Sequence, residues 1–524
     1  MFVRMKMICY AWVMLAILCM VSCHTLPDPV EKVEHQCLPL LKTGKLAYAV
    51  KKIHCRAGGS TTSLVPLMSN KEALESRLAL IDSAQRSLEI QIFIWMNDYT
   101  GKLIMERVLM AADRGVKVRL LIDDLLLGIS YTDSELAAIA SHPNIGLRLY
   151  NPNKLRDRIL PRTLDLVLNT KRCNQRMHNK SIVADGLLAI LTGRNIGDHY
   201  FGYGQGYNMV DFGAMFAGSI VTDIKKGFNR YWNSDPTYDA RAFIRDGKSL
   251  SLDKFRSVSR REILRAETAP NHQISITPQD WSRWFSDTAK RAYGGRAVYL
   301  EDAPENPSYS RPVIKEILRQ CESSCKEIYM VTPYLVPDER MMAMLSKARS
   351  RGVRVVLLVP TGSSNNHLIV HNQYQKYRKI LLRMGVEIYE FKHCPSSNMK
   401  YYINEGGSST RKVGLHVKLV LIDSSITYMG SMNFDGRAMF VNTEGGATVR
   451  SKALALELKK WVNLLCNPEN SWRLSLTKNG SIRWLAGEEI RKSEPSLDFL
   501  QGTLEFIFRP FSFRHEIFPD RRQH

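Results

Sequence analysis

The chain has 524 residues, of which 44% are hydrophobic and 24% are charged, and its formal net charge is +22. This composition is that of an ordinary globular protein, it excludes bulk disorder, and the length is enough for two or three domains. The positive charge favours an anionic partner (a phospholipid surface, a nucleic acid or a phosphorylated substrate), with solubility alone as the simpler interpretation.

The beginning of the chain has the pattern of a targeting segment over residues 1–22. Arg4 and Lys6 precede a short apolar run that ends at Cys23. This is typical of a secretory signal, and the run is short for a spanning helix, which needs about 20 residues. Because "MVSC" resembles a lipoprotein cleavage box, we expect either a lipidated Cys23 or an uncleaved membrane anchor. A linker region over residues 23–64 follows.

Seven cysteines lie beyond Cys23, and an odd number cannot all form pairs. Their spacing provides no zinc ligand set. Cys37 and Cys55 are candidates for a disulfide in an oxidising compartment, and buried free thiols are the alternative interpretation.

Residues 65–237 are predicted to form an α/β unit. A helical pattern over residues 70–85 precedes an apolar, β-branched stretch, and a second helical pattern over 101–114 precedes the buried-strand pattern "VKVRLLI". Gly115 between the latter two suits the C-terminal cap of a helix. Near-continuous apolar strands between helices predict a parallel or mixed sheet that is covered on both faces.

The polar motif "RMHNKSIVADGLLAILTGRN" follows in the same unit. His178 and Lys180 are two residues apart, so we expect them to share one face of a strand. That strand is predicted to end in a turn at Asp185, and a further short strand is predicted to end at Asn195.

Residues 297–466 repeat this order, including the motif "GLHVKLVLIDSSITYMGSMN". The equivalent landmarks are Glu89 and Glu327, 238 residues apart, Gly115 and Gly352, 237 apart, and His178 and His416, 238 apart. Three independent landmarks at nearly the same offset indicate an internal duplication. The predicted fold class is therefore α/β, with two pseudo-symmetric halves that share one active site.

Two segments fit neither half. Residues 238–296 are polar and basic, and we interpret them as an inserted, irregular connection. The tail over residues 467–524 contains "DFLQGTLEFIFRPFSF", which either packs on the body or lies on a membrane.

Each half supplies one imidazole, one ammonium and one amide. These are His178, Lys180 and Asn195 in the first half, and His416, Lys418 and Asn433 in the second. Facing each other, they suit a phosphate whose negative charge grows in the transition state. One imidazole attacks phosphorus, and the other protonates the leaving alcohol and deprotonates the incoming one. No metal and no cofactor is expected, because the lysines act as the cation.

Each histidine is also expected to have an acidic partner that holds its tautomer and orientation. The second half offers Glu444 in "NTEGG", and the first offers Asp211 in "GYNMVDFG". Each lies on the strand expected after its asparagine. Asp185 and Asp423 are expected instead to hold the turns beside the two motifs.

The doubled His-x-Lys-x4-Asp pattern resembles the phospholipase D superfamily over nearly the whole chain after about residue 65. The contexts "RMHNKSIVADGLLAILTGRNIGDHYFG" and "GSMNFDGRAMFVNTE" look like bacterial cardiolipin synthases of this type. The resemblance implies phospholipid substrates and a phosphatidyl-histidine intermediate, with the two His-Lys-Asn sets, Glu444 and Asp211 in the active site. By analogy, His178 is the predicted nucleophile. Ser431 is expected to face the phosphate, and it has no twin because Gly193 stands at the equivalent position.

Four functions remain as hypotheses. The first is phosphatidyl transfer between phospholipids, and the second is hydrolysis to phosphatidic acid, which differs only in admitting water as acceptor. The third is a nuclease, which the export signal and the lack of a nucleic-acid module oppose. The fourth is a membrane-binding or toxin-like factor, which two intact catalytic sets oppose.

The predicted partners are phospholipid substrates and an anionic membrane surface. The basic segment over residues 154–176 either lays the site on anionic lipid or forms a solvated loop. We expect the protein to be attached to the membrane of a bacterial cell envelope, facing the periplasm. The sequence indicates no oligomeric state.

Overall fold

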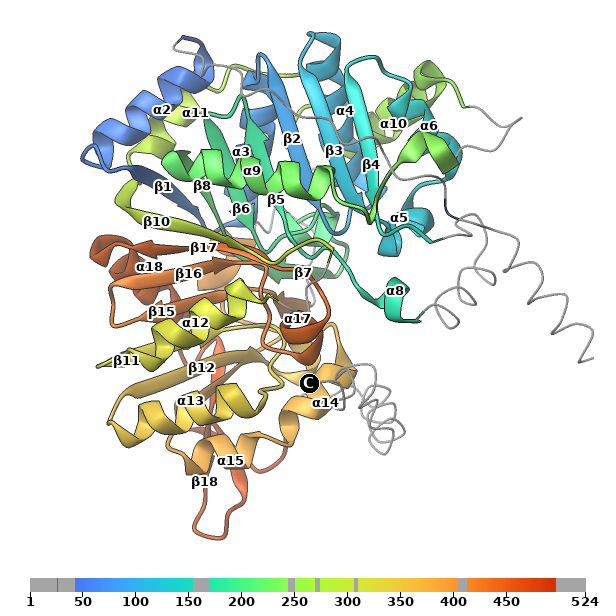
Figure 1. Cartoon of the computed structure of the whole chain (residues 1–524). Coiled ribbons are helices and arrows are strands. Elements are labelled where there is room, and N and C mark those ends of the chain that lie inside the picture. The colour runs from blue at the N-terminus through green and yellow to red at the C-terminus, as the bar shows by residue number, and fades with distance from the viewer. Residues whose placement is uncertain are drawn as a thin grey trace, which may run out of the picture.

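The computed structural model describes residues 26, 43–153, 170–243, 250–268, 274–305, 310–403 and 412–495 (Figure 1). The targeting segment, Cys23 and the aromatic part of the tail lie outside these residues, as does most of the basic segment over 154–176. Cys37 also lies outside them, so its disulfide with Cys55 stays a prediction. Among the described residues, no helix is both long enough and apolar enough to cross a membrane.

The first half alternates helices and strands. Its elements are α2 (Lys45–Arg56), β1 (Thr62–Leu67), α3 (Asn70–Ser83), β2 (Ser87–Ile92), α4 (Tyr99–Asp113), β3 (Lys117–Asp123), α5 (Asp124–Ser130), α6 (Asp133–Ala140), β4 (Ile145–Tyr150), α8 (Thr170–Asn174), β5 (Ser181–Ala184), β6 (Leu188–Thr192), η1 (Asp198–Tyr200), β7 (Tyr207–Val210), β8 (Gly213–Gly218), α9 (Ser219–Trp232), β9 (Thr237–Asp239) and η2 (Ala240–Phe243).

A connection and the second half follow. Their elements are α10 (Leu252–Glu267), α11 (Ser282–Ala289), β10 (Tyr293–Glu301), α12 (Pro312–Glu322), β11 (Glu327–Val331), α13 (Glu339–Ser350), β12 (Arg354–Pro360), η3 (Gly362–Ser364), α14 (Leu368–Gln375), α15 (Arg378–Arg383), β13 (Glu387–Phe391), η4 (Ser397–Met399), α16 (Lys400–Ile403), β14 (Lys412–Leu415), β15 (Leu419–Ile422), β16 (Ile426–Gly430), α17 (Gly436–Phe440), β17 (Gly445–Arg450), α18 (Lys452–Leu465), β18 (Ser471–Leu476), β19 (Ile482–Ala486) and β20 (Glu489–Arg491).

The two halves use one strand order. In the first half, β4, β3 and β2 are parallel, and β5, β6, β8 and β1 continue the sheet antiparallel. In the second half, β13, β12 and β11 are parallel, followed by β15, β16, β17 and β10. β1 pairs antiparallel with β10, which joins the two sheets at the centre of the molecule (Figure 1).

Helices cover both faces of each sheet. In the first half, α3 and α4 bury Leu74 and Val108 on one face, and α9 buries Ile220 on the other. α12, α13 and α18 take the corresponding places in the second half. One apolar core runs across the join between the halves and includes Phe216 and Leu421. The predicted α/β fold with two pseudo-symmetric halves is therefore confirmed.

Local sequence signals explain where the helices begin and end. The Ser69 hydroxyl accepts the N–H of Glu72 at the start of α3, and the Glu72 carboxylate accepts the N–H of Ser69. This reciprocal capping box satisfies two backbone donors that a helix start leaves free. Just after the C-terminal end of α4, Gly115 has a φ of 91°, a left-handed conformation that glycine adopts at low cost.

The expectation of an irregular connection over residues 238–296 is wrong for its two helices. α10 buries Phe255 and Ile263 along one narrow stripe, and Arg256 and Arg260 both donate to the Glu106 carboxylate on α4. The dense charge of this segment conceals the apolar stripe in the sequence. The described part of the linker region over residues 23–64 also contains a helix, α2, which packs on the first half.

The first part of the tail completes the second sheet. β18 pairs antiparallel with β13, and β19 and β20 extend the sheet outward. Trp472 and Trp484 from these strands are buried in the outer core of the second half. This part of the tail therefore packs on the body.

Candidate active site

The two histidine motifs lie where the halves meet. His178 and Lys180 occupy an extended segment immediately before β5, and His416 and Lys418 occupy the same place before β15, rather than positions inside the strands. The backbone of each segment bonds to the opposite half. The N–H of His178 donates to the Thr443 carbonyl over 2.9 Å, and the N–H of His416 donates to the Val210 carbonyl over 2.8 Å.

The acidic partners are consequently exchanged between the halves. His178 Nδ1 lies 2.9 Å from Glu444 Oε2 of the second half, and His416 Nδ1 lies 2.6 Å from Asp211 Oδ2 of the first. Glu444 follows directly after Thr443, and Asp211 directly after Val210, so the backbone pairing brings each carboxylate to the other half's histidine. The sequence suggested both acids without indicating this exchange.

Asp185 and Asp423 lie at the turns after β5 and β15. The Asp185 carboxylate accepts the backbone N–H groups of Gln85, Arg86 and Ser87 at 2.7–3.2 Å. Asp423 does the same for residues 325–327 at 2.8–3.0 Å. Both residues have a φ near 50°, a strained conformation for a non-glycine residue that these hydrogen bonds hold in place.

The two lysines are buried beside their histidines. Lys180 Nζ donates to the His178 carbonyl over 2.6 Å, and Lys418 Nζ donates to the His416 carbonyl over 2.7 Å. Burial lowers the pKa of Lys180 to about 7 and the pKa of Lys418 to about 8, against the opposing attraction of Glu444 and Asp211. Poorly solvated ammonium groups of this kind have a strong tendency to bind an anion.

Burial and the neighbouring lysines also keep both imidazoles neutral. They lower the pKa of His178 well below its usual value and lower the pKa of His416 to about 3, although Asp211 opposes this at His416. A neutral imidazole whose Nδ1–H donates to a carboxylate carries its lone pair on Nε2. This is the atom that attacks an electrophile in nucleophilic catalysis.

The two carboxylates differ in charge state. Burial raises the pKa of Glu444 to about 8, although Lys180, Ser431 and Lys418 oppose the shift. Burial also tends to raise the pKa of Asp211, but His416 and Lys418 outweigh it, so that this pKa falls below its usual value. Asp211 is therefore an anion at neutral pH. Glu444 is instead largely protonated, so that it forms a neutral pair with the neutral His178.

The two asparagines also have different surroundings. Asn195 Oδ1 accepts the N–H of Ile94 over 3.2 Å, and its amide donates to the Tyr200 hydroxyl over 2.9 Å. Asn433 is 4% exposed, and its Oδ1 atom has no hydrogen-bond partner among the described residues. The second half therefore keeps one amide group available for a ligand.

Ser431 does not lie as expected. Its hydroxyl donates to Glu444 Oε2 and accepts the N–H of Gly445 over 3.0 Å, so it supports the carboxylate rather than facing a phosphate. At the equivalent position of the first half, a Cβ on Gly193 would lie 2.6 Å from Asp211 Oδ1. Glycine is therefore required at position 193, because the carboxylate of the shorter Asp211 side chain lies close to the backbone there.

Aromatic rings that the sequence analysis missed surround the histidines. The Phe93 ring centroid lies 5.0 Å from that of His178, and the Tyr200 and Tyr334 centroids lie 5.3 and 6.4 Å from that of His416. Phe93 and Tyr334 follow the carboxyl ends of β2 and β11. Sites in parallel sheets form at these ends, so an aromatic residue there was an available signal.

The described residues include no group of three or more His, Cys, Asp or Glu side chains arranged to hold a metal ion. The groups that face the site are instead the two histidines, the two lysines and the two asparagines. Together they offer two nucleophilic or proton-transferring nitrogens and several donors for an anion.

Both histidine motifs lie within segments that match a known protein family. The family described as "Cardiolipin synthase, PLD-like domain" matches residues 78–232 and 314–465. Cardiolipin synthase C of Escherichia coli is 31% identical over 473 residues, which cover 87% of this chain and 96% of that protein. A cardiolipin synthase of Clostridium perfringens is 24% identical over 386 residues, which cover 72% of this chain and 65% of that protein.

A solved structure shares the fold. The crystal structure of phosphatidylserine synthase from Haemophilus influenzae has a TM-score of 0.56 to this chain at 14% sequence identity. The match covers 88% of this chain and 97% of that chain. Both family segments and this whole-length likeness correspond to the two halves described above.

Proposed function

The chain belongs to the phospholipase D-like cardiolipin synthase family, and from this premise we propose that it transfers a phosphatidyl group between phospholipids through a phosphatidyl-histidine intermediate. It is an enzyme of the phospholipase D type. The observation that carries the proposal is the exchanged pairing, with each half's histidine on the carboxylate of the other. Such pairing provides two oriented imidazoles at one anion-binding site.

In the first step, His178 Nε2 attacks the phosphorus of the donor phospholipid. A nitrogen–phosphorus bond forms and the bond to the headgroup oxygen breaks. His416, which is neutral in the free enzyme, takes up a proton when the anionic substrate binds, and the resulting imidazolium gives this proton to the leaving alcohol. The ionised Asp211 and the substrate phosphate both stabilise that imidazolium, which supports His416 as the acid. The neutral His178–Glu444 pair supports His178 as the nucleophile.

In the second step, a hydroxyl group on a second phospholipid gives its proton to His416 and attacks phosphorus. The nitrogen–phosphorus bond breaks, and His178 returns to its neutral state. Lys180, Lys418, Asn195 and Asn433 stabilise the charge on the phosphoryl oxygens in both steps. With phosphatidylglycerol as donor and acceptor, the products are cardiolipin and glycerol.

Exclusion of water favours transfer over hydrolysis. His178 is 6% exposed and His416 4% exposed, and Phe93, Tyr200 and Tyr334 pack against them. Because these aromatic residues exclude water, a covalent intermediate reacts more readily with an acceptor bound in the site than with solvent.

The test is to incubate the purified protein with phosphatidylglycerol vesicles, with and without phosphatidylethanolamine, and to separate the lipids. Cardiolipin supports the proposal, and the His178→Ala variant should make none. Phosphatidic acid as the main product would indicate hydrolysis instead. Unchanged lipid, together with cleavage of DNA in a separate incubation, would favour the nuclease hypothesis.

The proposal extends to the place of action. A basic start, an apolar run and Cys23 support export and attachment to the membrane, as a lipoprotein or through an uncleaved anchor. The net charge of +22 adds attraction to anionic lipid. We propose that the body faces the periplasm.

A further inference from the structure

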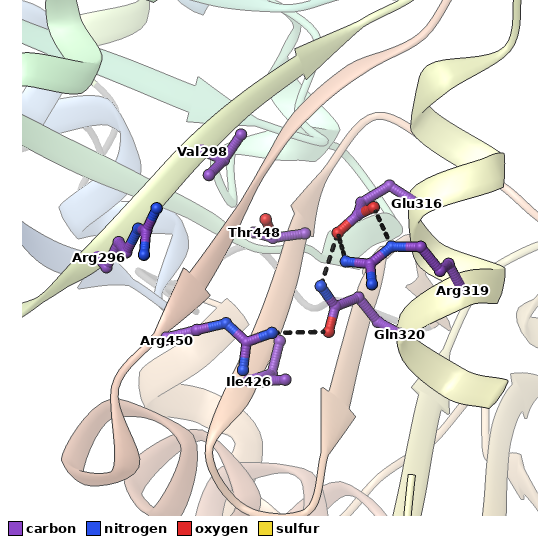
Figure 2. Close-up of a pocket in the computed structure, with 8 residues that line it drawn as sticks. All are labelled: Arg296, Val298, Glu316, Arg319, Gln320, Ile426, Thr448 and Arg450. Atoms are coloured by element: carbon purple, nitrogen blue, oxygen red, sulfur yellow. Dashed lines mark hydrogen bonds and ion pairs between the residues drawn. The ribbon is translucent and has the colours of Figure 1, made fainter. Parts of the chain in front are cut away.

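A pocket of about 250 Å³ lies between β10, β17 and α12, on the outer face of the second half (Figure 2). Its lining residues are Arg296, Val298, Glu316, Arg319, Gln320, Ile426, Thr448 and Arg450. None of them belongs to the active site. The lining carries three guanidinium groups and one carboxylate, so its net charge is positive.

Two of these arginines oppose each other directly. Arg296 on β10 and Arg450 on β17 are register partners in the antiparallel ladder, and both are exposed. Like charges at such positions repel each other and destabilise the pair of strands. Arg296 has no acidic partner among the described residues, and Arg450 donates only to Gln320 Oε1, over 3.3 Å.

The one carboxylate of the pocket relieves this repulsion only in part. Glu316 accepts two hydrogen bonds from Arg319, each of 2.7 Å, and a third from Gln320 of 2.6 Å (Figure 2). Its hydrogen-bonded cation is therefore Arg319 on the same helix, and its attraction for Arg450 is the smaller one. The two opposed guanidinium groups keep an unbalanced positive charge.

The internal symmetry indicates that this face lacks a cover. In the first half, Val65 and Met215 are register partners and are fully buried, because α2 packs over this face of β1 and β8. In the second half, Val298 and Thr448 are the corresponding pair, since Thr448 and Met215 each lie four residues after the acid of the site. Val298 is 49% exposed.

The chain order explains the missing cover. α2 directly precedes β1 in the sequence, and the helix that directly precedes β10 is α11. α11 packs against α2 in the first half, so it is not available for the β10–β17 face. The second half instead presents Arg296 and Arg450 where the first half has the buried register partners Ser63 and Ala217.

We propose that this pocket is a second anion site, which binds the phosphate group of an anionic phospholipid between Arg296 and Arg450. Guanidinium groups bind phosphate oxygens with paired hydrogen bonds, and the anion removes the repulsion across the ladder. Val298 and Ile426 border the arginines and offer apolar contact to the glycerol part of a lipid. The inference goes beyond the proposed reaction and does not require it.

The site is joined to the active site through the same strands. β17 begins at Gly445, next to Glu444, and β10 ends at Glu301, next to Asp302. The N–H of Asp302 donates to the Glu444 carbonyl over 2.9 Å, and the N–H of Glu444 donates to Asp302 Oδ2 over 3.1 Å. An anion that stabilises the pairing of β10 with β17 therefore also stabilises the backbone position of Glu444.

Calorimetric titration with dihexanoyl phosphatidylglycerol, below its micelle concentration, tests the proposal. The full-length protein with His178→Ala is used, so that no turnover occurs. We expect two sites, and adding Arg296→Gln with Arg450→Gln should remove one of them or weaken it at least about tenfold. Replacing Arg261 and Arg265, two exposed arginines on α10, removes the same charge elsewhere and should leave both sites.

Melting temperatures provide a second readout. Without lipid, the Arg296→Gln, Arg450→Gln protein should melt no lower than its parent, because a repulsion has been removed. With lipid, it should show a smaller increase than the parent and the α10 control. Two unchanged sites in the variant would overturn the proposal, and equal affinity for inorganic phosphate would show that the site does not recognise a lipid.

Discussion

The charge on one carboxylate distinguishes the two histidines. Asp211 is ionised and favours a proton on His416, whereas burial raises the pKa of Glu444 to about 8, so that this acid and His178 form a neutral pair. Ser431 donates to Glu444, and the equivalent Gly193 provides no such donor for Asp211. Two halves with the same catalytic residues therefore support different roles for their imidazoles.

This asymmetry predicts different defects in two variants. His178→Ala and His416→Ala should each lower turnover of a natural phospholipid by about 10⁴-fold or more, since neither histidine replaces the other. With a short-chain phosphatidyl nitrophenol, whose leaving group needs no proton, His416→Ala should still release a burst of nitrophenol equal to the enzyme concentration. His178→Ala should release none. The opposite pattern would make His416 the nucleophile.

The lysines predict the alkaline limit of activity. Burial lowers the pKa of Lys180 to about 7 and of Lys418 to about 8, so each loses its charge as the pH rises through that value. The kcat/KM for a soluble short-chain substrate should therefore fall by about tenfold per pH unit above about pH 7, and more steeply above about pH 8, where both lysines lose their charge. The kcat should fall only at higher pH, because a bound phosphate keeps the lysines protonated. A flat kcat/KM up to pH 9.5 would contradict this role.

At the scale of the elements, the part of the tail just after β20 supports one wall of the active site. Glu494, just after β20, accepts hydrogen bonds from His371 over 2.6 Å and from Arg378 over 2.7 and 2.9 Å. These residues belong to α14 and α15. The segment before α14 contacts Tyr334, whose hydroxyl donates to Asn366 over 2.6 Å and whose ring faces His416.

Glu494→Gln should therefore loosen α14 and, through it, Tyr334. Weakening the charge-assisted hydrogen bonds should lower the free energy of unfolding by about 2 kcal/mol. It should also lower kcat at a temperature where the variant is fully folded, and a loss of stability alone would not have this effect. Glu489→Gln is the matched control, because its partner Arg491 is a surface residue. If both variants changed the free energy of unfolding and kcat equally, the proposed role of Glu494 would be contradicted.

Strong local periodicity made the repeated elements predictable. The helical patterns over residues 70–85 and 101–114 correspond to α3 and α4, because these helices bury wide apolar faces and carry clear caps. α10 was missed because only a narrow stripe is buried among many charges. The exchange of Glu444 and Asp211 was not predictable, since it depends on backbone pairing between segments more than 200 residues apart.

At the scale of the whole molecule, duplication produces one site from two equivalent surfaces. β1 and β10 join the sheets, and each half then contributes a histidine segment to one side and a carboxylate to the other. Neither half contains a complete His-carboxylate pair. Because the halves share the site, α10 and α11 of the connection are tolerated where they pack on the outside of the first half, whereas its last residues, 293–296, belong to β10 at the join itself.

The last prediction concerns attachment to the membrane. A single lipid chain alone would bind reversibly, and each Lys or Arg near an anionic surface adds about 1 kcal/mol, which salt weakens. Release from membranes should therefore require detergent while Cys23 is intact, whereas high salt should suffice for Cys23→Ala if the signal is cleaved. Fractionation followed by mass spectrometry of the N-terminus measures both. A variant that resists high salt and keeps residues 1–22 has an uncleaved anchor instead, and wild-type protein free in the cytosol would refute export.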